Sequence, residues 1–264
     1  ILAVIDVSTG RKIVHLTASF KIKWAIYKLC TKCLNILIYS GKFNIISINS
    51  IKNIHNKMLT GGDGVSMVNI VKKEYKGWKN CIHISNGIIE AIATTDVGPR
   101  IIRFGFSGKE NEFCEVQDQV GTTGGDGWKI YGGHRLWHSP EDKDRTYVPD
   151  NSKIEWKKKK NGINLSQPVE PWTNIKKDME LTMSPDKPEV TVLHKLTNKG
   201  AWPVELSLWA LSVMAPGGKE IIPQPTGGNM FLPNRMLSLW PYTKLNDPRV
   251  YWGEKYIMLK QDTS

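Results

Sequence analysis

The sequence predicts an all-β protein built from antiparallel strands. From residue 78 onward, apolar and polar residues alternate with a period of two, turn-forming residues recur at short intervals, and stretches with helical periodicity are scarce. Residues 88–95 and 100–106 are rich in β-forming residues and flank Asp96-Val-Gly-Pro99, a turn sequence. We therefore expect these two segments to form a hairpin.

A second hairpin is expected between residues 153–156 and 163–167. The connection between them reads Lys157-Lys-Lys-Lys-Asn-Gly162. Asn-Gly supplies the positive φ angles that a tight hairpin turn needs. The four lysines are therefore expected at a solvated hairpin tip.

Three further strands are expected at residues 179–183, 189–198 and 204–214. Alternate residues of the last strand form an apolar face, which consists of Val204, Leu206, Leu208 and Ala210. The opposite face is polar and carries Trp209. Two roles stay open for this tryptophan: it holds a ligand, or it covers a sheet edge.

The positive charge is concentrated at the front of the chain. The 264 residues carry a formal net charge of +11. Residues 1–66 contain nine Lys or Arg and two Asp, a net charge of +7, which leaves +4 for the rest. We interpret residues 1–66 as a low-complexity basic leader from upstream sequence, with Met67 as the natural start and Met58 as the alternative. Residues 67–264 then form one domain.

Several classes of partner are disfavoured by these patterns. Residues 67–264 carry little net charge and their lysines gather at one hairpin tip, which argues against nucleic-acid binding. Residues 22–54 are interrupted by Lys and Asn every few positions, so neither a membrane-spanning helix nor a signal peptide is expected. The four cysteines show no disulfide framework. We therefore expect a cytoplasmic protein without membrane or nucleic-acid partners.

The densest group of chemically active residues is the stretch Tyr131-Gly-Gly-His-Arg-Leu-Trp-His-Ser-Pro-Glu141. His134 and His138 have a spacing that suits a metal site on a helix, but the glycine pair and Pro140 disfavour a helix. On a strand the two histidines would lie about 13 Å apart. We therefore expect no metal here.

Other chemistries fit this stretch less well than a sugar site. No pair of carboxylates has the spacing of a glycosidase, Ser139 lacks a strand-to-helix elbow, and Cys114 lacks a positive neighbour. A sugar site would use each of three residues. Trp137 would stack on the sugar ring, Arg135 would donate two hydrogen bonds to its oxygens, and His134 would donate or accept a proton. The alternative that stays open is a buried polar cluster, in which Arg135 pairs with Glu141 and His134 bonds to backbone.

Three strings in the chain carry a resemblance to a known family. They are Asp96-Val-Gly-Pro-Arg-Ile101, Tyr131-Gly-Gly-His-Arg-Leu-Trp137, and a long strand that ends in Ala215-Pro-Gly-Gly218. Over residues 70 to 264 the sequence resembles the galactose mutarotase-like domain, and more narrowly an uncharacterised bacterial family within that superfamily. The second string is the most specific of the three.

The resemblance implies an antiparallel β-supersandwich with a carbohydrate site on its concave face, as in aldose 1-epimerases. His134 matches the histidine that lies at the sugar, so the resemblance gives it a catalytic role. The strand at 208–216 has no histidine where the general acid would stand, and His194 lies on a different strand. The portion that would carry the base is missing, so we expect the domain to be incomplete at its C-terminus.

The sequence therefore favours a carbohydrate-binding domain without a cofactor, whose partner is a small-molecule or oligosaccharide ligand. An aldose 1-epimerase-like isomerase that uses His134 is the alternative, and a structural or interaction domain is the third possibility. The residues expected to contact the sugar are Arg100, Arg135, Trp137, Glu141, Trp209, Gln224, Asn229, Arg235 and Trp240. The sequence leaves open which sugar is bound and the oligomeric state.

Overall fold

The structure is a computed structural model of the 264-residue chain, and it describes residues 17–28, 35–40, 68–224, 231 and 241–260. The described residues contain strands, turns and bends but no α-helix. Every strand pair is antiparallel. The predicted all-β, antiparallel class is confirmed. No helix in this part of the chain is long and apolar enough to cross a membrane.

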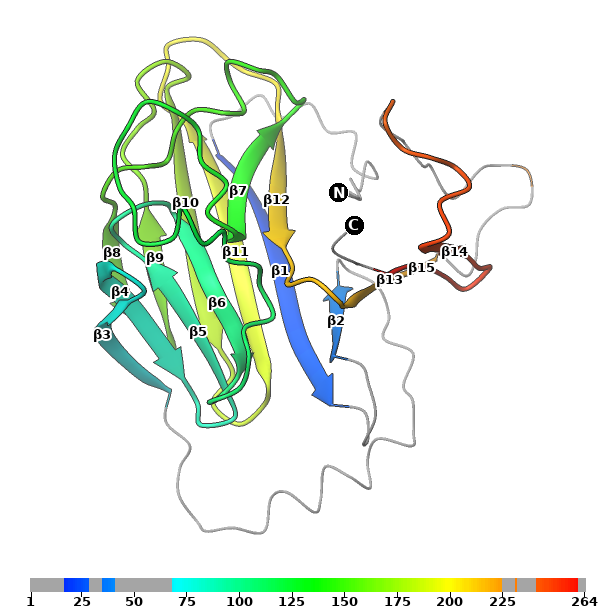
Figure 1. Ribbon diagram of the computed structural model, residues 1–264. Helices are drawn as coiled ribbons and strands as arrows, with labels where there is room; N and C mark the ends of the chain where they lie inside the picture. The colour runs from blue at the N-terminus through cyan, green and yellow to red at the C-terminus, as the bar shows by residue number, and fades with distance from the viewer. Residues whose placement is uncertain (1–16, 29–34, 41–67, 225–230, 232–240, 261–264) are drawn as a thin grey trace.

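Twelve of the strands form two six-stranded sheets (Figure 1). The sheet that we call the β11 sheet runs in the order β2 (Asn35–Ser40), β1 (Thr17–Lys28), β11 (Glu189–Asn198), β10 (Ile175–Met183), β9 (Gly162–Ser166) and β8 (Glu155–Lys159). The sheet that we call the β7 sheet runs in the order β12 (Ser207–Val213), β7 (Gly133–Ser139), β6 (Arg100–Phe106), β5 (Ile89–Thr94), β4 (Trp78–Ser85) and β3 (Asn69–Tyr75).

The main hydrophobic core lies between these two sheets. Burial alternates strictly along β10, because every second side chain of a strand faces the same side. Met179 and Leu181 of β10 share one core cluster with Ile101 and Phe104 of β6. The two sheets therefore pack face to face through their inner surfaces.

A second, smaller core covers the outer face of the β7 sheet. Here Ile102 of β6 and Trp78 of β4 pack with Tyr131, which belongs to the long connection between β6 and β7. The connections over this side are green in Figure 1. Residues 107–132 and 140–154 form these connections, so their side chains can contribute to a site on the outer face of the β7 sheet.

Both predicted hairpins are present. Strands β5 and β6 pair across the turn at 95–99, and β8 and β9 pair across Lys160 and Asn161, where Asn161 has a φ of 56°. The lysines at 157–160 are exposed, as expected for a hairpin tip. The strand expected at 204–214 is shorter, since β12 begins at Ser207, but Leu206, Leu208 and Ala210 do pack against the main core.

The β11 sheet extends into the segment that we interpreted as a leader. Strands β1 and β2 both fall within residues 1–66, and β1 pairs with β11 from Thr17↔Thr197 to Ala25↔Glu189. Whether residues 1–66 are native coding sequence stays a prediction. The third sheet is small, with the order β13 (Lys219–Pro223), β15 (Tyr256–Lys260) and β14 (Val250–Trp252), and it lies to the side of the two large sheets in Figure 1.

Candidate functional site

Strand β7 sends its side chains to two different environments. His134, Leu136 and His138 alternate with Arg135 and Trp137. Leu136 belongs to the main core and His134 contacts β11, so this set faces inward. Arg135 and Trp137 therefore face outward, toward the connections that cover the β7 sheet.

The glycine pair before His134 is required by close backbone contact. Gly132 has a φ of 103°, and a Cβ atom on it would lie 2.0 Å from the carbonyl oxygen of Cys114. Gly133 has a φ of 69°, and a Cβ atom there would lie 2.3 Å from the carbonyl oxygen of Ile101. Only glycine allows the chain to enter β7 at this distance from its neighbours.

Four aromatic side chains meet on the outward side of β7, and we call them the aromatic cluster: Trp128, Trp137, Tyr147 and Trp209. Trp137 and Trp209 are paired in register between β7 and β12, with ring centroids 5.3 Å apart. Trp128 and Tyr147 come from the connections and lie 5.8 Å and 5.1 Å from Trp137. The expected site residues Trp137 and Trp209 are therefore brought together.

The aromatic cluster has hydrogen-bond donors without acceptors. The indole Nε1 atoms of Trp128, Trp137 and Trp209 are buried and have no hydrogen-bond partner among the described residues. Trp137 and Trp209 are each 8% exposed, whereas Trp128 and Tyr147 are partly exposed. Buried donors of this kind cost about 1–3 kcal/mol each unless an acceptor reaches them. The cluster thus presents apolar rings together with N–H donors that a bound ligand could satisfy with hydrogen-bond acceptors.

Arg135 lies against the aromatic cluster. Its Cζ atom is 4.9 Å from the ring centroid of Trp137 and 5.2 Å from that of Trp128. Its terminal nitrogens contact Asp150 at 3.2 Å and donate to the Lys129 carbonyl at 3.1 Å, while its Nε has no hydrogen-bond partner within the described ranges. Burial lowers the pKa of Arg135 to about 9, and the neighbouring Arg100 adds to this, although Asp150 opposes it.

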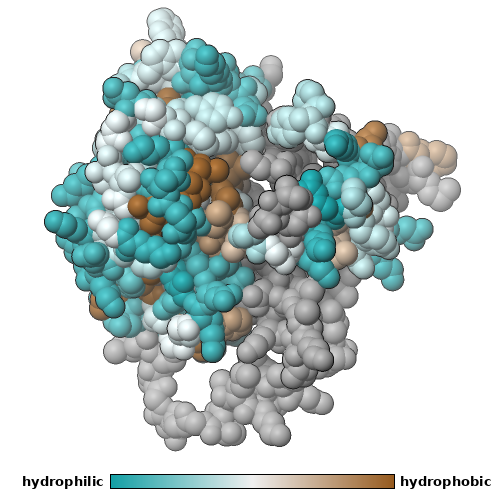
Figure 2. Space-filling view, in the orientation of Figure 1, coloured by the Kyte–Doolittle hydropathy of each residue, from teal (hydrophilic) through white to brown (hydrophobic). Residues whose placement is uncertain are grey.

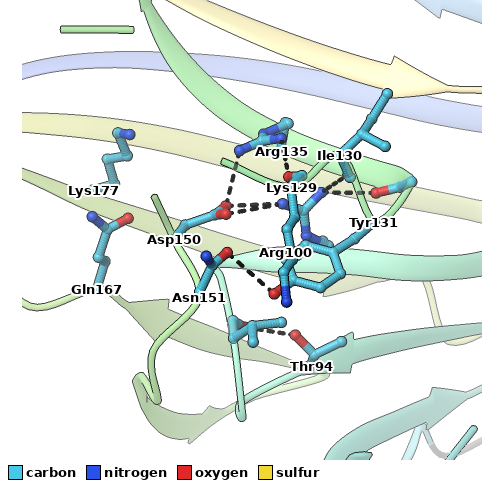
Figure 3. Close-up of polar contacts among 12 residues, drawn as sticks. Thr94, Arg100, Lys129, Ile130, Tyr131, Arg135, Asp150, Asn151, Gln167 and Lys177 are labelled. Carbon is cyan, nitrogen blue, oxygen red and sulfur yellow. Dashed lines mark hydrogen bonds and ion pairs between the residues drawn. The ribbon is translucent and has the colours of Figure 1, made fainter. Parts of the chain in front are cut away.

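Arg100 anchors the chain just before β7. It donates to both oxygens of Asp150, at 3.2 Å and 2.9 Å, and to the carbonyls of Ile130 and Gly132 (Figure 3). Its side chain is fully buried and its Cζ lies 5.0 Å from the Tyr131 ring centroid. Arg100 was expected at the sugar; these contacts instead fix the backbone from which Arg135 and Trp137 project.

Asp150 is the shared partner of the two arginines. It is 7% exposed, and its pKa is lowered because the charges of Arg100, Arg135 and Lys177 outweigh the effect of burial. The sequence reasoning missed it, along with Trp128 and Tyr147. Asp150 is nine residues after the quoted stretch and Trp128 is three residues before it, so a wider window around that stretch would have included both.

A second ion pair is buried next to this group. Lys177 Nζ lies 2.5 Å from Glu170 Oε1, and the two side chains are 3% and 1% exposed. Gln167 also donates to Glu170, at 3.2 Å. The side chains of Lys177 and Gln167 lie beside Asp150 in Figure 3. The sequence reasoning missed these residues as well, because alternation on β10 predicts an apolar side chain at 177.

His134 lies on the other side of β7 from the aromatic cluster. Its Nε2 is 2.7 Å from Nε2 of His194, its Nδ1 is 2.8 Å from the Ser212 hydroxyl, and its side chain has no exposed surface. Its pKa is lowered well below 6.5, mainly by burial and also by His194. The proton-transfer role expected for His134 therefore has no access to solvent in this arrangement.

Glu141 is exposed at the edge of the aromatic cluster. It accepts a hydrogen bond from the Tyr147 hydroxyl, which raises the pKa of Tyr147 to about 12. The pairing of Arg135 with Glu141, considered from the sequence, is replaced by the pairing with Asp150. The buried polar cluster is thus real, but it is built from different partners.

Gln224 is the one further expected site residue that the structure describes, and it is not part of the aromatic cluster. Gln224 follows β13 of the third sheet and its side-chain amide donates to the Ile222 carbonyl at 3.3 Å. Asn229, Arg235 and Trp240 lie outside the described residues. Within the described ranges there is no group of three or more His, Cys, Asp or Glu that could hold a metal ion. No family model, no curated protein and no solved structure matches this chain.

Proposed function

We propose that the protein binds a carbohydrate at the aromatic cluster, and that its sandwich is of the galactose mutarotase type. The observation that carries the proposal is the set of three buried indole N–H groups in the aromatic cluster, for which the described part of the chain supplies no acceptor. A sugar ring offers C–H faces that stack on indoles and hydroxyl oxygens that accept hydrogen bonds. One sugar could therefore both stack on the rings and accept hydrogen bonds from the indole N–H groups.

The charges argue for a sugar rather than a cationic ligand. Aromatic clusters also bind quaternary ammonium groups through their negative ring faces. Here the Arg135 guanidinium already lies against two of the rings. A second cation would be repelled by this charge, whereas a neutral or acidic ligand would not.

The surface of the molecule is compatible with entry at this place. Trp128 and Tyr147 are partly exposed, and Glu141 at the edge is exposed. Figure 2 shows a mostly hydrophilic face with a small group of hydrophobic residues near the centre of the view; Trp and Tyr are pale on this hydropathy scale, so that group is not the aromatic cluster. Binding sites for small molecules are typically lined by apolar and aromatic side chains with a few polar groups among them.

Binding is preferred to epimerisation because of where the histidines lie. The epimerase alternative needs His134 at the sugar, with a second acid or base near it. His194 does supply a second imidazole, 2.7 Å away, but both histidines are completely buried between the sheets. Polarimetry of a fresh galactose solution with the protein tests this alternative directly.

The test of binding is calorimetric titration of the full chain with hexoses and short oligosaccharides. The variant Trp137→Phe keeps an aromatic ring but removes the unpartnered N–H. A lost hydrogen bond of about 1 kcal/mol weakens binding about five-fold. The matched control is Trp202→Phe, since Trp202 is 80% exposed and is not part of the cluster.

Saturable binding that weakens in Trp137→Phe and not in Trp202→Phe supports the proposal. Equal effects of the two substitutions would place the sugar elsewhere and overturn it. No heat of binding with any sugar, from protein whose circular dichroism shows the β spectrum, would favour the structural or interaction role.

A further inference from the structure

We propose that the ligand of the aromatic cluster carries a carboxylate, so that its class is an acidic sugar such as a uronic acid. This inference rests on the proposed function and deepens it. Three features of the described residues carry it: an excess of buried positive charge, a guanidinium N–H without a partner, and the contact of that guanidinium with the cluster.

The buried charged groups around Arg135 do not balance. Asp150 pairs with both arginines, Glu170 pairs with Lys177, and Lys177 is close enough to act on the charge of Asp150. The connected set therefore has three cations and two carboxylates: Arg100, Arg135, Lys177, Asp150 and Glu170. One positive charge is left without a buried counter-charge, and an anion bound here would supply it.

Arg135 is the member of this set that lies against the aromatic cluster. Its guanidinium contacts Trp128 and Trp137, whereas Arg100 lies under Tyr131 and Lys177 lies between the two sheets. The Nε–H of Arg135 has no acceptor, although the side chain is only 3% exposed. Guanidinium N–H groups bind carboxylates through short, charge-assisted hydrogen bonds.

The lowered pKa of Arg135 also favours a ligand with a carboxylate. Burial and the charge of Arg100 make the guanidinium less stable in its charged form than an exposed one, and Asp150 offsets this only in part. A carboxylate next to Nε would stabilise the charged form further. An uncharged hydroxyl would do so much less.

Glu141 acts against an acidic ligand. It is exposed at the edge of the cluster and bonded to Tyr147. Its negative charge repels a carboxylate that approaches Arg135, while a neutral sugar does not feel this repulsion. Replacing Glu141 by Gln should therefore raise the affinity for an acidic sugar more than that for its neutral counterpart.

The experiment compares matched sugars on the full chain: glucuronate with glucose, and galacturonate with galactose, by calorimetric titration at 50 and 300 mM NaCl. We expect the acid to bind at least about ten-fold more tightly than the neutral sugar at low salt, and less so at high salt. In Glu141→Gln this ratio should rise. In Arg135→Lys, which keeps the charge but loses the planar N–H group, the ratio should fall.

The outcomes separate the two proposals. If acids and neutral sugars bind equally, or if Arg135→Lys leaves the ratio unchanged, this inference is overturned while the proposed function stands. If no sugar of either kind binds, the proposed function itself fails. Should Arg135→Lys not fold, the comparison of acid with neutral sugar on the unmodified chain still decides.

Discussion

His134 Nε2 lies 2.7 Å from His194 Nε2, and this contact joins β7 of one sheet to β11 of the other. One imidazole donates and the other accepts, so the pair holds one shared proton when both rings are neutral. Ser212 bonds to the remaining nitrogen of His134 at 2.8 Å. Protonation of both rings would put a proton on each of the two facing nitrogens and break this contact.

This arrangement predicts that the protein loses stability as the pH falls below about 6.5. The pKa of His134 is lower in the folded protein than its ordinary 6.5, because of burial and then of the nearby His194 charge. Between those two values the unfolded chain binds more protons, so the free energy of unfolding rises with pH and falls on acidification. Urea unfolding at pH 7.5, 6.5, 5.5 and 5.0 measures this.

The variant His134→Gln checks which group is responsible. It should reduce the pH dependence of unfolding by up to about one proton. His83 and His138 also have lowered pKa values, mainly through burial, so His83→Gln on β4 is the matched control with a smaller effect. An unchanged pH dependence in His134→Gln would show that the pair does not govern acid stability.

Gly132 should not tolerate alanine. The substitution would place a Cβ atom 2.0 Å from the Cys114 carbonyl oxygen, at a φ of 103°. We expect a loss of more than about 3 kcal/mol in the free energy of unfolding, because backbone on both sides has to move. Thermal or urea unfolding gives the value.

Gly124→Ala is the control for this prediction. Gly124 has a φ of 70°, but a Cβ atom there would meet nothing within 4 Å. Only the conformational cost applies, about 1 kcal/mol. Similar losses for the two variants would mean that close contact is not what makes Gly132 necessary.

The buried pair Lys177–Glu170 should behave as a coupled unit. Lys177→Met leaves the Glu170 carboxylate buried without its cation, and Glu170→Gln leaves the Lys177 ammonium buried without its anion. Each substitution should lower the free energy of unfolding by about 3–5 kcal/mol. The double variant should cost less than the sum of the two, since no charge is then left alone. A double-mutant cycle by urea unfolding measures the coupling.

The neighbouring Lys176 supplies the control on the same strand. It faces the outer side of β10, and its ion pair with Asp178 has an N–O distance of 3.7 Å at 33% exposure of the lysine side chain. Lys176→Met should change stability by less than about 0.5 kcal/mol. An equally large effect of Lys176→Met would contradict the special role of burial at 177.

The sequence was sufficient to place seven of the fifteen strands in the described part of the chain, including those of both hairpins. Strand alternation and the Asn-Gly turn act over a few residues, so local pattern decides them. The outward direction of Trp209 and the inward packing of Leu208 followed from the same alternation. The pairing of β1 with β11 was missed, because no local signal in residues 17–28 specifies a partner more than 160 positions away.

The sequence by itself determined which residues are concentrated at 131–141 and that glycines must precede them. Only the tertiary structure decided their roles. Arg135 and His134 are adjacent in the chain, yet one joins Asp150 and the aromatic cluster while the other joins His194 on the far side of the strand. The physical reason is that a strand sends neighbouring side chains to opposite faces, and what each face meets depends on segments brought together from distant parts of the chain.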